Sequence, residues 1–173
     1  WPSPYIQYVI ILFMILSGVN FSLYYFALKR KFEKILHNEE LKWFLITVFS
    51  FSILVMFTLI NWNDVTTFST FEKAFRDALF QVSSCMTTTG FVTADYMLWK
   101  PVTWVIIIMV MLVGSSAGST CGGIKMVRIV IVFKYMYAEF KRLIHPNAII
   151  PITYSREIIK NDVVNRVIAF VLL

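Results

Sequence analysis

Long apolar runs alternate with short basic segments along this chain. The first run covers residues 5–28 and is followed by a cluster of lysines and arginine, and the second covers residues 43–60. A helix needs about 20 residues to cross about 30 Å of hydrocarbon, and both runs are close to that length. Lysine and arginine concentrate on the cytoplasmic side of membrane proteins. The pattern therefore predicts two spanning helices joined by a cytoplasmic loop.

A shorter amphipathic segment follows the second run. Ser69 and Glu72 form a capping-box pattern that predicts the start of a helix over residues 71–86. About 16 residues, with several charges in the outer half, are too few and too polar to cross a bilayer. We therefore expect a re-entrant helix that enters from outside and stops, followed by a return segment at residues 92–100.

The polar letters MTTTGF come where this helix ends. Unpaired backbone groups cost several kcal/mol each in hydrocarbon, so such a segment must pack in protein or line a watery path. The negative end of the helix dipole favours a cation, and glycine permits backbone angles that aim a carbonyl at a pore axis. An ordinary polar turn between surface helices is the alternative. We predict that carbonyls of four residues replace the water shell of an ion: Thr87, Thr88, Thr89 and Gly90.

The apolar stretch at residues 101–140 is too long for one crossing, because it would extend about 60 Å as a continuous helix. Near the bilayer midplane it is interrupted by the letters GSSAGSTCGG. These residues are Gly114, Ser115, Ser116, Ala117, Gly118, Ser119, Thr120, Cys121, Gly122 and Gly123. The alternative to a functional break is a small-residue patch for helix packing, which the G-x-x-x-G spacing also fits. Lys125 and Arg128 then mark the cytoplasmic flank.

Composition agrees with an all-α integral membrane protein. Hydrophobic residues make up 58% of the 173 residues, and the mean hydropathy is +0.72. The net charge of +6 does not indicate a nucleic acid partner, because the basic residues lie beside apolar runs, next to the lipid bilayer. The chain ends inside an apolar run, so we expect it to be a piece of a longer polypeptide.

Two enzyme-like patterns occur in the glycine-rich stretch. The letters GSSAG, with Ser116 at the centre, match a serine nucleophile elbow, but His37 and His145 both lie in basic segments far from the midplane. A phosphate-loop match fails because Met126 follows Lys125 where serine or threonine is required. An intramembrane serine hydrolase is therefore a remote alternative. We predict a protein that is not an enzyme and needs no cofactor.

The order of a span, a capped re-entrant helix, TTTGF and a second span broken by GSSAGSTCGGIK resembles the Trk/Ktr/HKT superfamily of potassium uptake proteins, specifically its TrkH-like bacterial membrane subunits. Members carry repeats of span, pore helix and span around a pseudo-fourfold, channel-like pore. The resemblance implies a closing span at 1–28, a cytoplasmic basic loop at 29–42, a complete repeat at 43–140, a cytoplasmic connection at 141–162 and the start of the next span at 163–173.

The resemblance also implies roles. Gly90 matches the signature glycine of a K⁺ selectivity filter, and residues 114–123 match an intramembrane loop that gates the pore. Members commonly read GGSAGSTGGGIK, so Ser115 and Cys121 replace glycines here and should stiffen the loop. Further implications are a homodimer, a cytoplasmic ring of nucleotide-binding regulatory subunits and a multi-pass position in the bacterial inner membrane. A tetrameric cation channel subunit is the alternative, but TTTGF lacks the second glycine of a TVGYG filter.

The charge pattern makes a testable prediction about topology. Residues 29–42 and 125–142 should face the cytoplasm, whereas residues 62–71 and 95–100 should face outside. A cysteine placed at Thr66 in intact cells should react with an impermeant thiol reagent, and one placed at His37 should not. The opposite labelling pattern would overturn this topology.

Overall fold

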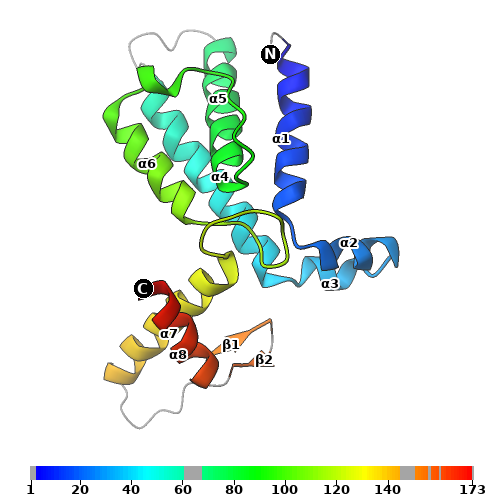
Figure 1. The fold of residues 1–173 in the computed structure, drawn as a ribbon, viewed down its shortest axis with the longest axis vertical. Helices are drawn as coiled ribbons and strands as arrows, with labels where there is room; N and C mark the ends of the chain where they lie inside the picture. Colours follow the sequence, from blue (N-terminus) through cyan, green and yellow to red (C-terminus); the bar gives the residue numbers. More distant parts are fainter. Residues whose placement is uncertain (1–2, 61–67, 145–150, 156, 160, 173) are drawn as a thin grey trace.

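The computed structural model describes residues 3–60, 68–144, 151–155, 157–159 and 161–172. The helices are α1 (Pro4–Gly18), α2 (Phe21–Leu28), α3 (Phe32–Leu36), α4 (Glu39–Leu59), α5 (Phe68–Met86), η1 (Tyr96–Leu98), α6 (Pro101–Leu112), α7 (Met126–Ile144) and α8 (Asn161–Leu172). Figure 1 shows α1, α4, α5 and α6 as an upper bundle, α2 and α3 as a sideways arm, and α7 with α8 below.

The second predicted span coincides with most of α4. The helix begins after Asn38, whose side chain accepts a hydrogen bond from Leu41 N–H at 2.9 Å. Acidic residues in its first turn, Glu39 and Glu40, favour the positive end of the helix dipole. Among the described helices, α4 is the one that is long and apolar enough to cross a membrane without counting a bend. Part of the predicted loop at 29–42 is thus helical, as α3 and the start of α4.

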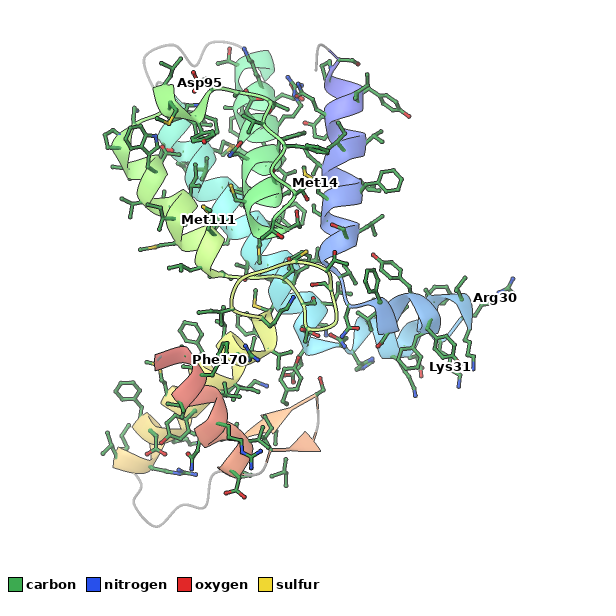
Figure 2. All side chains as sticks on the ribbon, viewed as in Figure 1. Met14, Arg30, Lys31, Asp95, Met111 and Phe170 are labelled. Atoms are coloured by element: carbon green, nitrogen blue, oxygen red, sulfur yellow. The ribbon has the colours of Figure 1, made fainter. Side chains whose placement is uncertain are left out.

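The first predicted span is not one continuous helix. α1 and α2 meet at a bend of 100°, so the prediction of a single helix over residues 5–28 is wrong. Asn20 causes the restart, because its side chain accepts the N–H of Ser22 at 2.9 Å and caps α2. α2 then leaves the bundle as part of the arm, and Figure 2 places Arg30 and Lys31 at its tip.

The re-entrant helix is present as α5. It packs against α4, α1 and α6, with Ala78, Phe80 and Val82 fully buried. The helix already includes Ser69, so the residue predicted to be its N-cap lies inside the helix. The expected external turn falls at residues 61–67, which lie outside the described part of the chain. After Met86 the chain returns along the bundle to η1 and α6 (Figure 1). The predicted turn-back within the bundle is therefore confirmed.

The long apolar stretch is broken as predicted. α6 ends at Leu112 and α7 begins at Met126, so the glycine-rich letters lie between the upper bundle and the lower helices (Figure 1). Beyond α7, a small antiparallel hairpin pairs β1 (Thr153–Tyr154) with β2 (Glu157–Ile158) in the segment predicted to be a cytoplasmic connection. A second small core fixes α8 and the hairpin on α7 through Ile131, Ala138, Ile152 and Val164.

Large apolar side chains cover much of the outside of the upper bundle. Phe13 on α1 is 65% exposed, Ile53 on α4 is 42% exposed and Ile108 on α6 is 58% exposed. A monomeric soluble protein rarely leaves such continuous apolar surface in water. The surface is suited to lipid or to further helices of a larger protein. The mostly helical fold therefore agrees with the predicted all-α membrane class.

Candidate functional site

The threonine segment, residues 87–90, is fixed by the C-terminus of α5. Thr87 donates to Ser83 O twice, from its N–H at 2.9 Å and from its hydroxyl at 2.7 Å. The hydroxyl oxygens of Thr87 and Thr89 are 2.8 Å apart. Thr88 and Gly90 have φ of 54° and 79°, a left-handed conformation that is unusual for a β-branched residue. The segment thus leaves the helix in a defined, non-helical conformation.

The carbonyl oxygens of the threonine segment have no partner in the described part of the chain. No hydrogen bond there ends on a backbone oxygen of Thr87, Thr88, Thr89 or Gly90. Thr87 is buried, whereas the other three residues are exposed, and a Cβ added to Gly90 would have no atom within 4 Å. Backbone carbonyls in such a position can coordinate a dehydrated cation.

The glycine-rich loop, residues 114–123, is closed at its neck. Gly114 N–H donates to Ile124 O at 2.9 Å, and Ile124 N–H donates to Leu112 O at 3.1 Å. A Cβ on Gly114 would lie 2.5 Å from Gly122 O, and Gly123 has a φ of +75°. The neck therefore depends on glycine at a point where two backbone segments touch.

The loop rests on the bend between α1 and α2. Ser116 N–H donates to Gly18 O at 3.1 Å, and Phe21 N–H donates to Gly118 O at 3.4 Å. The carbonyl and the N–H that the bend removes from helical bonding are therefore used to hold the loop. Cys121 Sγ contacts Ser17 O at 3.9 Å, and the thiol is buried. The bend and the loop form one interface, which the sequence did not indicate.

The loop also contacts the threonine segment directly. Ser115 is fully buried, and its hydroxyl donates to Met86 O, at the last residue of α5, at 3.0 Å. Gly122 N–H donates to the hydroxyl oxygen of Thr88 at 3.2 Å. The structure thus brings together the two polar stretches that the sequence singled out. It also gives Ser115, expected only to stiffen the loop, a bonding partner at the end of α5.

The predicted basic flank is engaged by other groups. Lys125 Nζ donates to the carbonyls of Cys121 and Ser119, the latter at 3.4 Å. The ammonium group therefore binds the backbone of the glycine-rich loop. The guanidinium of Arg128 lies 3.7 Å from the ring centre of Phe170 on α8. Figure 2 shows Phe170 projecting from α8 in the lower part of the molecule. Each of these cations therefore has a partner within the chain.

Glu40 is a part of this site that the sequence analysis missed. Its side chain is buried, with the residue only 3% exposed, and its carboxylate accepts the N–H of Ala117 in the loop. The side chain of Asn20 and the positive charge of Lys125 lie near the same carboxylate and favour its ionised form. Acidic residues at a helix start usually interact with the helix dipole in solvent, so the sequence carries no signal that separates Glu40 from Glu39.

The geometry gives no support to the serine hydrolase alternative. Ser116 lies in the loop and not in a strand-to-helix elbow, and its buried hydroxyl forms no hydrogen bond within the described part of the chain. His37 lies at the end of α3, where its Nδ1 contacts Glu33 O at 2.9 Å. His145 lies outside the described residues. No described histidine is bonded to Ser116 as a general base.

These features define a mostly helical membrane protein with a span, a re-entrant helix and a broken second span. The chain belongs to the TrkH family of cation transport proteins, whose sequence profile matches residues 2–173. The Trk system potassium uptake protein TrkH of Escherichia coli (strain K12) is 32% identical over 169 residues, covering 97% of this chain and 34% of that protein. TrkG of the same organism is 32% identical over 164 residues, covering 93% and 33%.

A solved structure of a family member has the same fold as this chain. The crystal structure of the potassium transporter TrkH from Vibrio parahaemolyticus matches with a TM-score of 0.88 and 27% identity, over 99% of this chain and 37% of that chain. The present chain thus spans about a third of the length of its relatives. The resemblance to TrkH-like proteins is confirmed, and family membership favours it over a conventional tetrameric channel subunit.

The geometry of the loop neck predicts that an alanine substitution is tolerated less well at Gly114 than at Gly122. Replacing Gly114 with alanine should lower stability by about 1–3 kcal/mol, because the new Cβ meets backbone that cannot move aside easily. Gly122→Ala is the matched control, since its Cβ would meet only the Thr88 methyl group at 3.4 Å. Thermal unfolding of both full-length variants in detergent would test this. An equal loss in the two variants would contradict the described neck.

Proposed function

We propose that the chain is the central part of a potassium uptake protein, in which the threonine segment lines the selectivity filter and the glycine-rich loop is the gate beneath it. The single observation that carries this proposal is the direct bonding between the two segments, through Ser115 to Met86 O and through Gly122 to Thr88. A loop attached to an ion-coordinating segment is placed where its movement can open or close the path.

The chemistry of the threonine segment supports selectivity for K⁺. A filter must offer oxygens that replace the hydration shell of the ion, and the unpartnered carbonyls of residues 87–90 meet this requirement. The C-terminus of α5 ends at the segment, so the negative end of its dipole favours a cation there. One chain segment supplies one wall of such a filter. The remaining walls come from other repeats of the longer protein.

The setting of the loop supports a gate. Its backbone is non-helical between α6 and α7, and it is held by hydrogen bonds to α1, α4 and the end of α5. Hydrogen bonds of this kind are worth about 1 kcal/mol each, so a modest input can displace the loop without unfolding the surrounding helices. The packing-patch alternative explains the close contact at Gly114 but not the bonds from the loop to the threonine segment.

The wider assembly follows from the family and forms part of the proposal. The relatives are named as Trk system potassium uptake proteins. We place this protein in the bacterial inner membrane as a multi-pass homodimer that works with a cytoplasmic ring of nucleotide-binding regulatory subunits. It moves K⁺ and transforms no substrate, so it requires no cofactor besides the ion that it transports.

The filter assignment predicts a loss of selectivity in Gly90→Ser. A Cβ at a φ of +79° strains the backbone, and the distorted carbonyls should discriminate K⁺ from Na⁺ less well, by about 1–3 kcal/mol. Competing K⁺ and Na⁺ uptake by the full-length variant in liposomes measures this change. Ala94→Ser adds the same hydroxyl in the return segment and should leave the ratio unchanged. An unaltered ratio in Gly90→Ser would remove Gly90 from the filter.

The gate assignment predicts opposite effects from two changes in the loop. Deleting residues 117–120 leaves the neck at Gly114 and Ile124 but removes the bond to Glu40, and it should increase K⁺ flux. Gly122→Ala fits without overlap and restricts the backbone, so it should hinder displacement and lower flux by about two- to fivefold.

Flux per folded protein in liposomes separates this prediction from a packing role. A purely structural loop would give equal flux per folded protein in the deletion, the alanine variant and the wild type. Both variants would then differ from wild type only in the yield of folded protein.

A further inference from the structure

Glu40 lies where the loop, the α1–α2 bend and α4 meet. Its carboxylate accepts from Ala117 N–H, and the side chain of Asn20 and the charge of Lys125 lie near enough to favour its ionised form. Asn20 Oδ1 accepts Ser22 N–H at 2.9 Å. Asn20 therefore caps α2 beside the carboxylate, while Ala117 N–H binds the carboxylate from the loop.

Most of the partners of this carboxylate are carried by the loop region. A buried charge is costly unless hydrogen bonds and opposite charge compensate it. Displacing the loop would remove the bond from Ala117 N–H and move the carbonyls that hold Lys125, so the carboxylate would lose the compensation that both provide. The carboxylate is thus satisfied best when the loop is seated, so it opposes loop displacement.

The neighbouring carboxylate faces different partners. Glu39 accepts from Lys134 of α7 at 2.5 Å, and Lys134 also donates to Thr153 O in the hairpin at 2.8 Å. Both groups of this ion pair are about a third exposed, unlike Glu40. Burial, with Glu40 and Glu39 nearby, raises the pKa of Tyr154 in the same hairpin. Glu39 therefore gives a matched control: the same side chain, one residue away, without a bond to the loop.

From this arrangement we infer that Glu40 is a positioning residue that holds the glycine-rich loop in place beneath the threonine segment. The inference rests on the proposed function only for its consequence, namely that releasing the loop increases ion flux. The bond itself can be tested without measuring transport, because the loop carries a buried thiol at Cys121.

The test uses the full-length protein with Cys121 as its only cysteine. Glu40→Ala should raise the rate at which a water-soluble maleimide modifies Cys121 by about tenfold or more, as expected for the loss of a hydrogen bond to a charged group. Glu40→Gln keeps the size and one acceptor oxygen, so its rate should rise by about fivefold. Glu39→Gln should change the rate by less than about twofold, because its exposed ion pair contributes little.

A second single-cysteine background separates loop release from general loosening. With Cys85 in α5 as the only cysteine, none of these variants should change the maleimide rate by more than about twofold, because α5 keeps its packing. If Glu40→Ala does not fold, the result is judged on Glu40→Gln, which preserves the shape of the side chain.

Each outcome is decisive. An unchanged Cys121 rate in the folded Glu40 variants, or equal acceleration at Cys121 and Cys85, would overturn the inference. Faster modification of Cys121 alone, with raised K⁺ flux in liposomes, supports both the inference and the gate. Faster modification of Cys121 alone without raised flux would uphold the role of Glu40 and refute the proposed gate.

Discussion

The structure depends on one constraint: backbone that leaves helical geometry in the middle of an apolar bundle must find hydrogen-bond partners inside the protein. Three stretches do so here, at the α1–α2 bend, at the threonine segment and at the glycine-rich loop. They satisfy one another's polar groups, as when Ser116 N–H bonds to Gly18 O and Gly122 N–H bonds to the Thr88 hydroxyl. Because each stretch supplies partners to another, they lie together at one level of the bundle.

The pairing among these three stretches leaves some backbone carbonyls of the threonine segment without a hydrogen-bond partner in the described chain. The N–H groups of Thr87, Thr88 and Thr89 are used by carbonyls at the end of α5, whereas the carbonyls of the same residues have no partner in the described chain. The three threonine donors are thus used, whereas their acceptors remain. A segment with this imbalance is suited to a cation and unsuited to an anion, and the dipole of α5 acts in the same direction. The proposed cation site therefore needs only the oxygen atoms that this backbone pairing leaves available.

The sequence predicts those parts of the fold that depend on many residues at once. Run length and hydropathy indicate α4, the shortness and charge of residues 71–86 indicate a re-entrant helix, and the glycine content of residues 114–123 indicates the break between α6 and α7. The family resemblance, and not the chemistry of either stretch, places the two polar stretches in one pore. These predictions agree with the structure because each depends on many residues and not on a single contact.

The parts that the sequence does not reveal depend on single contacts. Residues 5–28 have the composition of one span, and the break into two helices is held by a few contacts, namely the capping bond of Asn20 and the loop bonds at Gly18 and Phe21. Glu40 and Glu39 are alike in sequence, and the packing of the loop alone buries one and leaves the other in a partly exposed ion pair. The β1–β2 hairpin is too short for a periodic pattern, and its position depends on Ile152 in the second core.

Ser115 and Cys121, which stand where the resemblance implies glycines, can be understood in the same terms. A side chain in place of glycine restricts the loop backbone, but at both positions it also gains a contact that glycine cannot make. Ser115 bonds to Met86 O, whose carbonyl would otherwise be left at the buried end of α5, and Cys121 fills space against Ser17. Both contacts exist only while the loop is seated. Both side chains therefore stabilise the loop in the position described here, at the same interface as Glu40.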